Sequence, residues 1–251
     1  MQGRAMVFIL AASPMTQAFR PFCLLFPDDR PATIAPAMTA NDTTPVTLTC
    51  GRALLRGTVG FTTVSVAGFA IWAFGGRWFY AHVGEAGLYA ACSIVFLGLS
   101  GLLLHPLISG PRPLLRFYKV FIPAFVAYAI VWCAFWFALH FGAGEWLGSF
   151  FGCAAFALVL SRAFGNYRAL PKVIALLFIT HSAGYFAGGF AMEYLMKSGN
   201  AEWLNLSKRG VGVLAKLMWG VCFGAGFGFG IGYAFFAMQK EPSRRMPARR
   251  R

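Results

Sequence analysis

Six long apolar stretches constrain the fold of this chain more than any other feature. Each is long enough, at about 1.5 Å per helical residue, to cross a bilayer core about 30 Å thick. They are Thr58–Gly75, Ala86–Ser109, Val120–Gly142, Trp146–Phe164, Val173–Met192 and Val211–Met238. The sequence therefore predicts an all-α, polytopic integral membrane protein, with a six-transmembrane-helix bundle over residues 58–238.

The composition agrees with this class. Hydrophobic residues make up 58% of the chain and charged residues only 12%, about half the usual charged share of a soluble domain. A net charge of +14 would indicate nucleic acid as a partner in a soluble protein. Here most Lys and Arg flank apolar stretches, and no nucleic-acid-binding motif accompanies them. We therefore expect the lipid bilayer, and no nucleic acid, as the partner.

The basic residues divide unequally between the two sides of the predicted bundle. One side carries fourteen: Arg52, Arg56, Arg112, Arg116, Lys119, Arg162, Arg168, Lys172, Lys240, Arg244, Arg245, Arg249, Arg250 and Arg251. The other carries four: Arg77, Lys197, Lys208 and Arg209. Basic loops remain in the cytoplasm under the positive-inside rule. The ratio predicts a bacterial cytoplasmic (inner) membrane protein with both termini in the cytoplasm.

The two ends of the chain are predicted to be disordered. The arm, residues 1–57, contains an apolar run at residues 5–12 that imitates a signal-peptide core, yet cleavage there would invert the charge bias. Met38 is an alternative start of translation. The tail, residues 239–251, is basic. Together with the cytoplasmic basic loops it is expected either to contact anionic lipids or to serve only as a topology anchor.

Glycines recur at helix-packing intervals in the last two stretches. They are Gly184 and Gly188 in the fifth stretch, and Gly220, Gly224, Gly228 and Gly232 in the sixth, where Gly226 and Gly230 form a second face. Glycine lets helix backbones approach closely in lipid. We expect a central final helix with close neighbours on two flanks. A glycine ridge could equally bind a second copy of the chain or another membrane subunit.

Five residues form a candidate intramembrane polar site: His105, His181, Tyr185, Glu193 and Lys216. Ionisable groups are costly at membrane depth and mark functional positions. In one hypothesis His181 carries protons, and Glu193 and Lys216 form an outer gate. In a second, His105 and His181 hold a haem. In a third, the histidines bond to neighbouring backbone or to a hydroxyl such as that of Tyr185, while Lys216 extends toward the interface.

The sequence lacks HExxH, GxSxG and Walker A motifs, and no cysteine pair has the CxxC spacing of a metal site. No catalytic residue, cofactor or metal is predicted. An enzyme would have to use outer-loop residues: His82, Glu85, His140, Glu145 and Glu193. The leading hypothesis is a small transporter or channel, or a transport-associated component. The alternative is a non-catalytic membrane scaffold or assembly subunit that packs through the glycine ridge of its last helix.

Overall fold

The computed structural model describes residues 48–139, 142–197 and 202–240. The rest of the predicted arm and tail lies outside these residues. The helices are α4 (Cys50–Ala70), continued by the π-helical turn η1 (Ile71–Gly75) and α5 (Gly76–His82), α6 (Gly84–Leu104) with the short η2 (His105–Leu107), α7 (Pro113–Leu139), α8 (Ala143–Phe164), η3 (Tyr167–Ala169), α9 (Leu170–Met196), η4 (Glu202–Leu204) and α10 (Lys208–Gln239). Six of these helical segments are long and apolar enough to cross a membrane. The predicted all-α six-helix membrane bundle is confirmed.

The first span begins earlier than the hydropathy indicates. Helix α4 starts at Cys50, so residues 50–57, assigned above to a disordered arm, are helical. The side chain of Thr49 caps the helix by accepting a hydrogen bond from the backbone N–H of Arg52. Ala53 and Leu54 are fully buried in the core. Residues 50–57 were not predicted as part of the span because Arg52 and Arg56 lower the local hydropathy. The cap at Thr49 and the packing of Ala53 and Leu54 make them helical.

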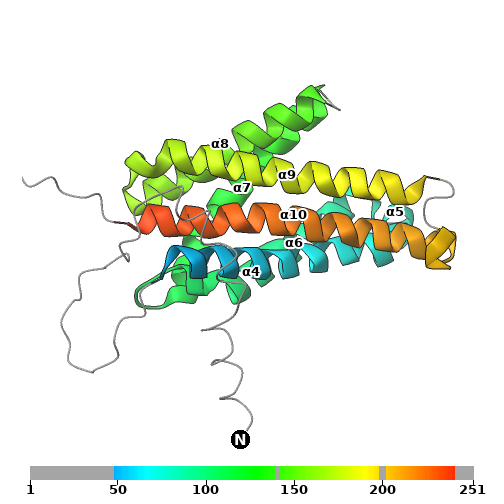
Figure 1. Ribbon diagram of the computed structural model, residues 1–251, viewed down its shortest axis with the longest axis horizontal. Helices are drawn as coiled ribbons and strands as arrows, with labels where there is room; N and C mark the ends of the chain where they lie inside the picture. The colour runs from blue at the N-terminus through cyan, green and yellow to red at the C-terminus, as the bar shows by residue number, and fades with distance from the viewer. Residues whose placement is uncertain (1–47, 140–141, 198–201, 241–251) are drawn as a thin grey trace, which may run out of the picture.

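Helix α10 is the central element of the bundle. Figure 1 shows it lying between α4 and α9, and its contacts with these two helices are the most extensive in the fold. The most apolar 18-residue stretch of α10 is 72% buried inside the bundle, whereas the corresponding stretches of the other five spans are 17% to 44% buried. Helices α7 and α8 form a hairpin, and α6 packs on α4. Where α7 and α8 meet, their ends diverge from the other helices (Figure 1).

One face of α10 meets α4 through glycines. A Cβ placed on Gly224 would lie 2.6 Å from the Cα of Thr62, and one on Gly228 would collide with the carbonyl oxygen of Gly57. Further along the same face, a Cβ on Gly232 would strike the backbone of Ala53, also on α4. Contacts shorter than 3.0 Å are essentially never made by real Cβ atoms. The backbones of α4 and α10 are therefore closer than any side chain at these positions would permit.

A second glycine face of α10 meets α9. A Cβ on Gly226 would lie 2.9 Å from the Cα of Gly184, and one on Gly230 would lie 2.7 Å from Oγ1 of Thr180. A Cβ on Gly188 would meet the Trp219 side chain. The glycine ridge is thus occupied by α4 and α9 of the same chain. The packing inside the chain accounts for these glycines, so the alternative hypothesis of a partner bound at the ridge gains no support from the described residues and stays a prediction.

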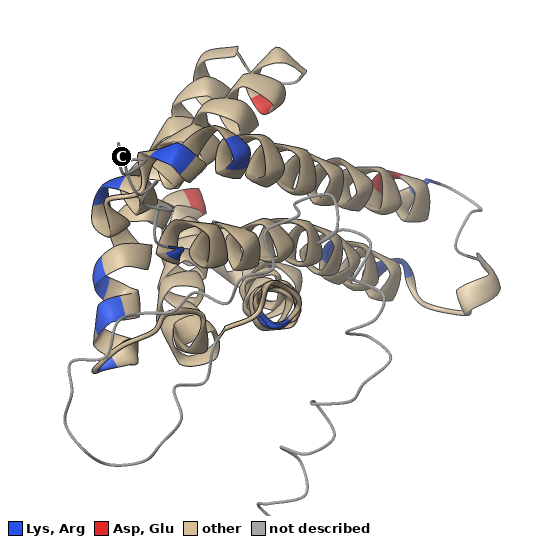
Figure 2. Cartoon of the chain, turned by 60° about the vertical axis from the view of Figure 1, so that its left-hand side comes forward, with Lys and Arg blue, Asp and Glu red and all other residues tan. Residues whose placement is uncertain are grey.

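Basic residues gather at the end of the bundle where α4 begins and α10 ends, which we call the basic end (Figure 2). Two of its arginines bind loop carbonyls: Arg56 Nη1 donates to Pro106 O at 3.2 Å, and Arg116 Nη1 donates to Ser109 O at 2.6 Å. The alternating helix directions bring the loops after α6 and α8 to this end. The loop after α7, which contains Gly142, lies at the opposite end.

Candidate functional site

His181 lies in the middle of α9 and is fully buried. It is about 17 Å along the helix axis from Leu170, by helical rise. Its Nε2 atom is 2.6 Å from the hydroxyl oxygen of Tyr128 on α7. The rings of Phe223 and Phe227 meet the imidazole in T-shaped contacts, with centroids at 5.5 and 5.0 Å. The Nδ1 atom is buried and has no hydrogen-bond partner among the described residues, so one polar position of this ring remains unsatisfied.

Tyr185 extends the polar groups toward the opposite end. It lies one turn after His181 on α9, and the two rings stack with centroids 6.0 Å apart and an interplanar angle of 6°. The Tyr185 hydroxyl donates to Oε1 of Glu145 on α8 at 3.1 Å. We call Tyr128, His181, Tyr185 and Glu145 the polar chain. It runs from the buried centre to the α7–α8 loop and draws on three helices.

Glu145 is held in place by the start of its own helix. Its Oε2 atom accepts a hydrogen bond from the backbone N–H of Gly142 at 3.2 Å. Gly142 has a positive φ of 68°, which favours glycine at this turn. A carboxylate in the first helical turn is also stabilised by the helix dipole. The local sequence therefore orients Glu145 so that its second oxygen faces Tyr185.

The hydroxyl partner of His181 differs from the one suggested by sequence. Tyr185 shares the helix and face of His181, but it stacks on the imidazole and gives its hydroxyl to Glu145. Tyr128, from the neighbouring α7, supplies the hydrogen bond instead. Because Tyr185 lies one turn from His181 on the same helix, the two rings stack face to face. Tyr128 comes from a facing helix, so its hydroxyl can reach the ring nitrogen at the edge of the imidazole.

Lys216 lies beside the polar chain but does not belong to it. Its Nζ atom is 4.6 Å from the centroid of Trp72, a cation–π contact. Trp72 belongs to the π-helical turn η1, a type of irregularity that is frequent at functional sites. Trp219 contacts both Trp72, at 6.1 Å, and Tyr185, at 5.5 Å. Aromatic rings therefore connect Lys216 to the polar chain.

The predicted gate between Glu193 and Lys216 is not formed in this structure. Glu193 has an exposed side chain near the end of α9. Lys216 packs on Trp72, and no ion pair joins the two described side chains. The carboxylate that takes part in the polar chain is that of Glu145, a residue predicted only as part of an outer loop.

His105 has a structural role at the end of α6. Its Nδ1 atom lies 3.0 Å from the carbonyl oxygen of Leu102 and 3.1 Å from that of Gly101. The residue that would normally donate to Leu102 is Pro106, which has no N–H. The imidazole replaces that missing donor. His105 therefore stabilises the end of α6, whereas the hydrogen-bond partner of His181 is Tyr128, so the described contacts do not join the two histidines of the haem hypothesis.

The other candidate sites are not assembled. Within the described ranges no three His, Cys, Asp or Glu side chains form a group that could hold a metal ion. Of the outer-loop residues considered for an enzyme, His82 binds the carbonyl oxygen of Trp78 at 2.8 Å. His140 lies outside the described residues. The polar chain is thus the strongest candidate for chemistry at membrane depth.

Comparisons with known proteins do not assign this chain to a family. No family model matches it, and neither the curated proteins nor the solved structures give a match. A function must therefore be argued from the geometry of the site.

Proposed function

We propose that the protein is a small transporter or channel, or a transport-associated component, in which the polar chain carries protons to and from His181. One observation carries this proposal. A fully buried imidazole with one free ring nitrogen is linked by stacked and hydrogen-bonded side chains to Glu145 at the α7–α8 loop. Ionisable groups at this depth are functional candidates by default.

One step of proton transfer along the polar chain lacks a direct hydrogen bond. Glu145 and Tyr185 share a hydrogen bond along which a proton can move. Between Tyr185 and His181 the rings only stack, so transfer there requires a bridging water or a ring rotation. At His181 the hydrogen bond to Tyr128 leaves Nδ1 as the free position. Proton movement in this proposal is therefore gated at the step between Tyr185 and His181.

The proposal includes the orientation and location predicted from charge. The basic end faces the cytoplasm of a bacterial cell, both termini lie there, and the polar chain opens toward the opposite side. The ratio of basic residues supports this orientation. Basic loops and the tail contact anionic lipid headgroups, at about 1 kcal/mol for each basic residue near the surface.

Proton flux into liposomes tests the proposal. Purified protein is reconstituted with an internal pH-sensitive dye, and a potassium diffusion potential drives proton entry. We expect flux above that of protein-free liposomes, and at least a tenfold loss with His181→Gln, which keeps a polar side chain but cannot titrate. His82→Gln is the matched control, because His82 bonds to the Trp78 carbonyl and stacks on the Trp78 ring at the far end of the first span. Absence of flux in the wild type, or equal flux in wild type and His181→Gln, contradicts the proposal.

A membrane scaffold is the second candidate, and the packing around His181 favours it. Four aromatic rings, those of Tyr128, Tyr185, Phe223 and Phe227, contact the imidazole. In a scaffold this cluster only stabilises the bundle. His181→Gln would then lower the stability in detergent, while liposomes carrying wild-type protein would show no flux. Crosslinking in native membranes would identify the assembled partner.

A further inference from the structure

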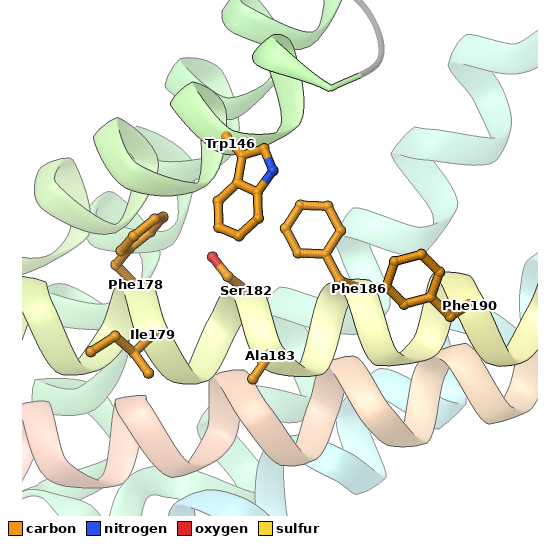
Figure 3. Close-up of a pocket in the computed structure, with 7 residues that line it drawn as sticks. All are labelled: Trp146, Phe178, Ile179, Ser182, Ala183, Phe186 and Phe190. Atoms are coloured by element: carbon orange, nitrogen blue, oxygen red, sulfur yellow. The ribbon is translucent and has the colours of Figure 1, made fainter.

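A groove of about 520 Å³ lies between α8 and α9, separate from the polar chain. Its lining residues are Trp146, Phe178, Ile179, Ser182, Ala183, Phe186 and Phe190. In Figure 3 the rings of Trp146 and Phe186 stand over the middle of α9, and Phe178 stands on the other side of Ser182. The groove has the size and the aromatic lining of small-molecule sites.

Ser182 carries the one hydroxyl group among the residues that line the groove. Its side chain is only 5% exposed, and its Oγ atom has no hydrogen-bond partner among the described residues. A serine inside a helix usually bonds to the carbonyl of the preceding turn. Here the hydroxyl instead points into the groove, between the rings that line it (Figure 3). A buried hydroxyl without a partner is costly, and a ligand with a hydrogen-bond acceptor at this point would satisfy it.

The depth of Ser182 restricts the chemistry of that acceptor. It lies about 18 Å along the axis from Leu170 and about 21 Å from Met196, and hence near the middle of α9. The ester carbonyls of glycerolipids lie at the edges of a hydrocarbon core about 30 Å thick, roughly 15 Å from its centre. A lipid tail that reaches Ser182 therefore presents only hydrocarbon. A carbonyl on an apolar ring is not tethered to the interface and can reach this depth.

The groove walls favour a flat ring. The centroids of Trp146 and Phe186 are 4.5 Å apart, and those of Trp146 and Phe178 are 6.0 Å apart. These three rings pack on one another at such distances, so a further ring would stack on the faces and edges that they turn toward the groove. Phe190 and Ile179 are 67% and 61% exposed, so the groove opens on the surface that lipid surrounds. A ligand can enter it from the bilayer.

We propose that this groove binds a membrane-soluble quinone. The ring lies among Trp146, Phe178 and Phe186, one ring carbonyl accepts a hydrogen bond from Ser182 Oγ, and the isoprenoid chain follows α9 past Phe190. Only binding is proposed, and no electron transfer is assigned. This site does not depend on the polar chain, because it uses the other face of α9 and the unpaired hydroxyl of Ser182.

Quenching of tryptophan fluorescence tests the proposal in detergent-solubilised full-length protein. The probe is a benzoquinone with one isoprene unit, compared with prenylbenzene, which has the same apolar shape but no carbonyl. Saturable quinone binding is expected in the wild type, with a dissociation constant about 2- to 10-fold higher in Ser182→Ala, as expected for loss of a neutral hydrogen bond. Prenylbenzene should bind the wild type and Ser182→Ala equally.

Ser100→Ala is the matched control, because Ser100 is also a buried serine whose hydroxyl has no partner, but it lies on α6 away from the groove. Its affinity for quinone should equal that of the wild type. The proposal is overturned if quinone and prenylbenzene bind equally, which would mean that the groove takes hydrocarbon tails. It is also overturned if Ser182→Ala binds quinone as the wild type does, or if quinone binding does not saturate.

Discussion

The contact between α4 and α10 at Gly228 permits a sharp test of the packing. In Gly228→Ala the new methyl group would collide with the carbonyl oxygen of Gly57 and lie 2.9 Å from Cβ of Phe61. Neither obstacle is the flexible end of a side chain. The two helix backbones must therefore separate, and the close contacts along the whole interface are weakened.

The expected cost follows from two opposing effects. Overpacking a tight core destabilises by about 1–3 kcal/mol. Alanine is a better helix former than glycine by about 0.8–1.0 kcal/mol, which offsets part of this cost. Gly212→Ala on the same helix isolates the second effect, because a Cβ there meets nothing within 4 Å. We expect Gly212→Ala to be neutral or stabilising and Gly228→Ala to be destabilising by about 2 kcal/mol relative to it.

The measurement is unfolding of purified protein in mixed micelles, titrated with sodium dodecyl sulfate and followed by circular dichroism. The midpoint should decrease for Gly228→Ala and remain unchanged or increase for Gly212→Ala. If both variants unfold at the wild-type midpoint, α4 and α10 are not packed as closely as described. A loss of equal size in both would show that glycine at these positions serves helix flexibility and not close approach.

Two further variants test the basic end of the bundle in the same assay. His105→Ala removes the donor that replaces the N–H missing at Pro106, so we expect a loss of about 1–3 kcal/mol; an unchanged midpoint would contradict the capping role. Asn166→Ala removes the amide that donates to the Ala237 and Lys240 carbonyls at 3.2 and 3.0 Å, and should cost about 1 kcal/mol or more, with earlier hydrogen exchange of the last turn of α10. Retained protection of that turn would show that packing alone holds it.

The number and type of membrane spans could be predicted from sequence, because hydrocarbon requires long apolar helices whatever the tertiary contacts. The ends of those helices could not be predicted as well. Helix α4 begins at Cys50 and not at Thr58, since a cap at Thr49 and the burial of Leu54 outweigh two arginines in the local hydropathy. Helix boundaries depend on contacts with other segments, which a hydropathy window does not contain.

The candidate site was likewise predicted only in part from the sequence. The sequence identified His181 as an intramembrane residue, but it did not identify Tyr128 as its partner or Glu145 as the end of the polar chain. Both come from other helices, and their register against α9 is set by packing. A local signal for Glu145 was present, because a glycine three residues before a glutamate at a helix start favours the observed capping bond. The unpaired hydroxyl of Ser182 has no sequence signal at all, since only the structure shows that its neighbours are apolar.

The central place of α10 has a consequence for how the molecule is made. Synthesis proceeds from the N-terminus, so the five other membrane segments leave the ribosome before α10 does. Until then the glycine-bearing sides of α4 and α9 lack the helix that packs between them, although α6, α7 and α8 already connect the two through their own contacts. Assembly of this bundle is therefore completed by its final segment, and a nascent chain stalled before Lys208 would expose to the membrane's quality-control proteases the surfaces that the finished protein conceals.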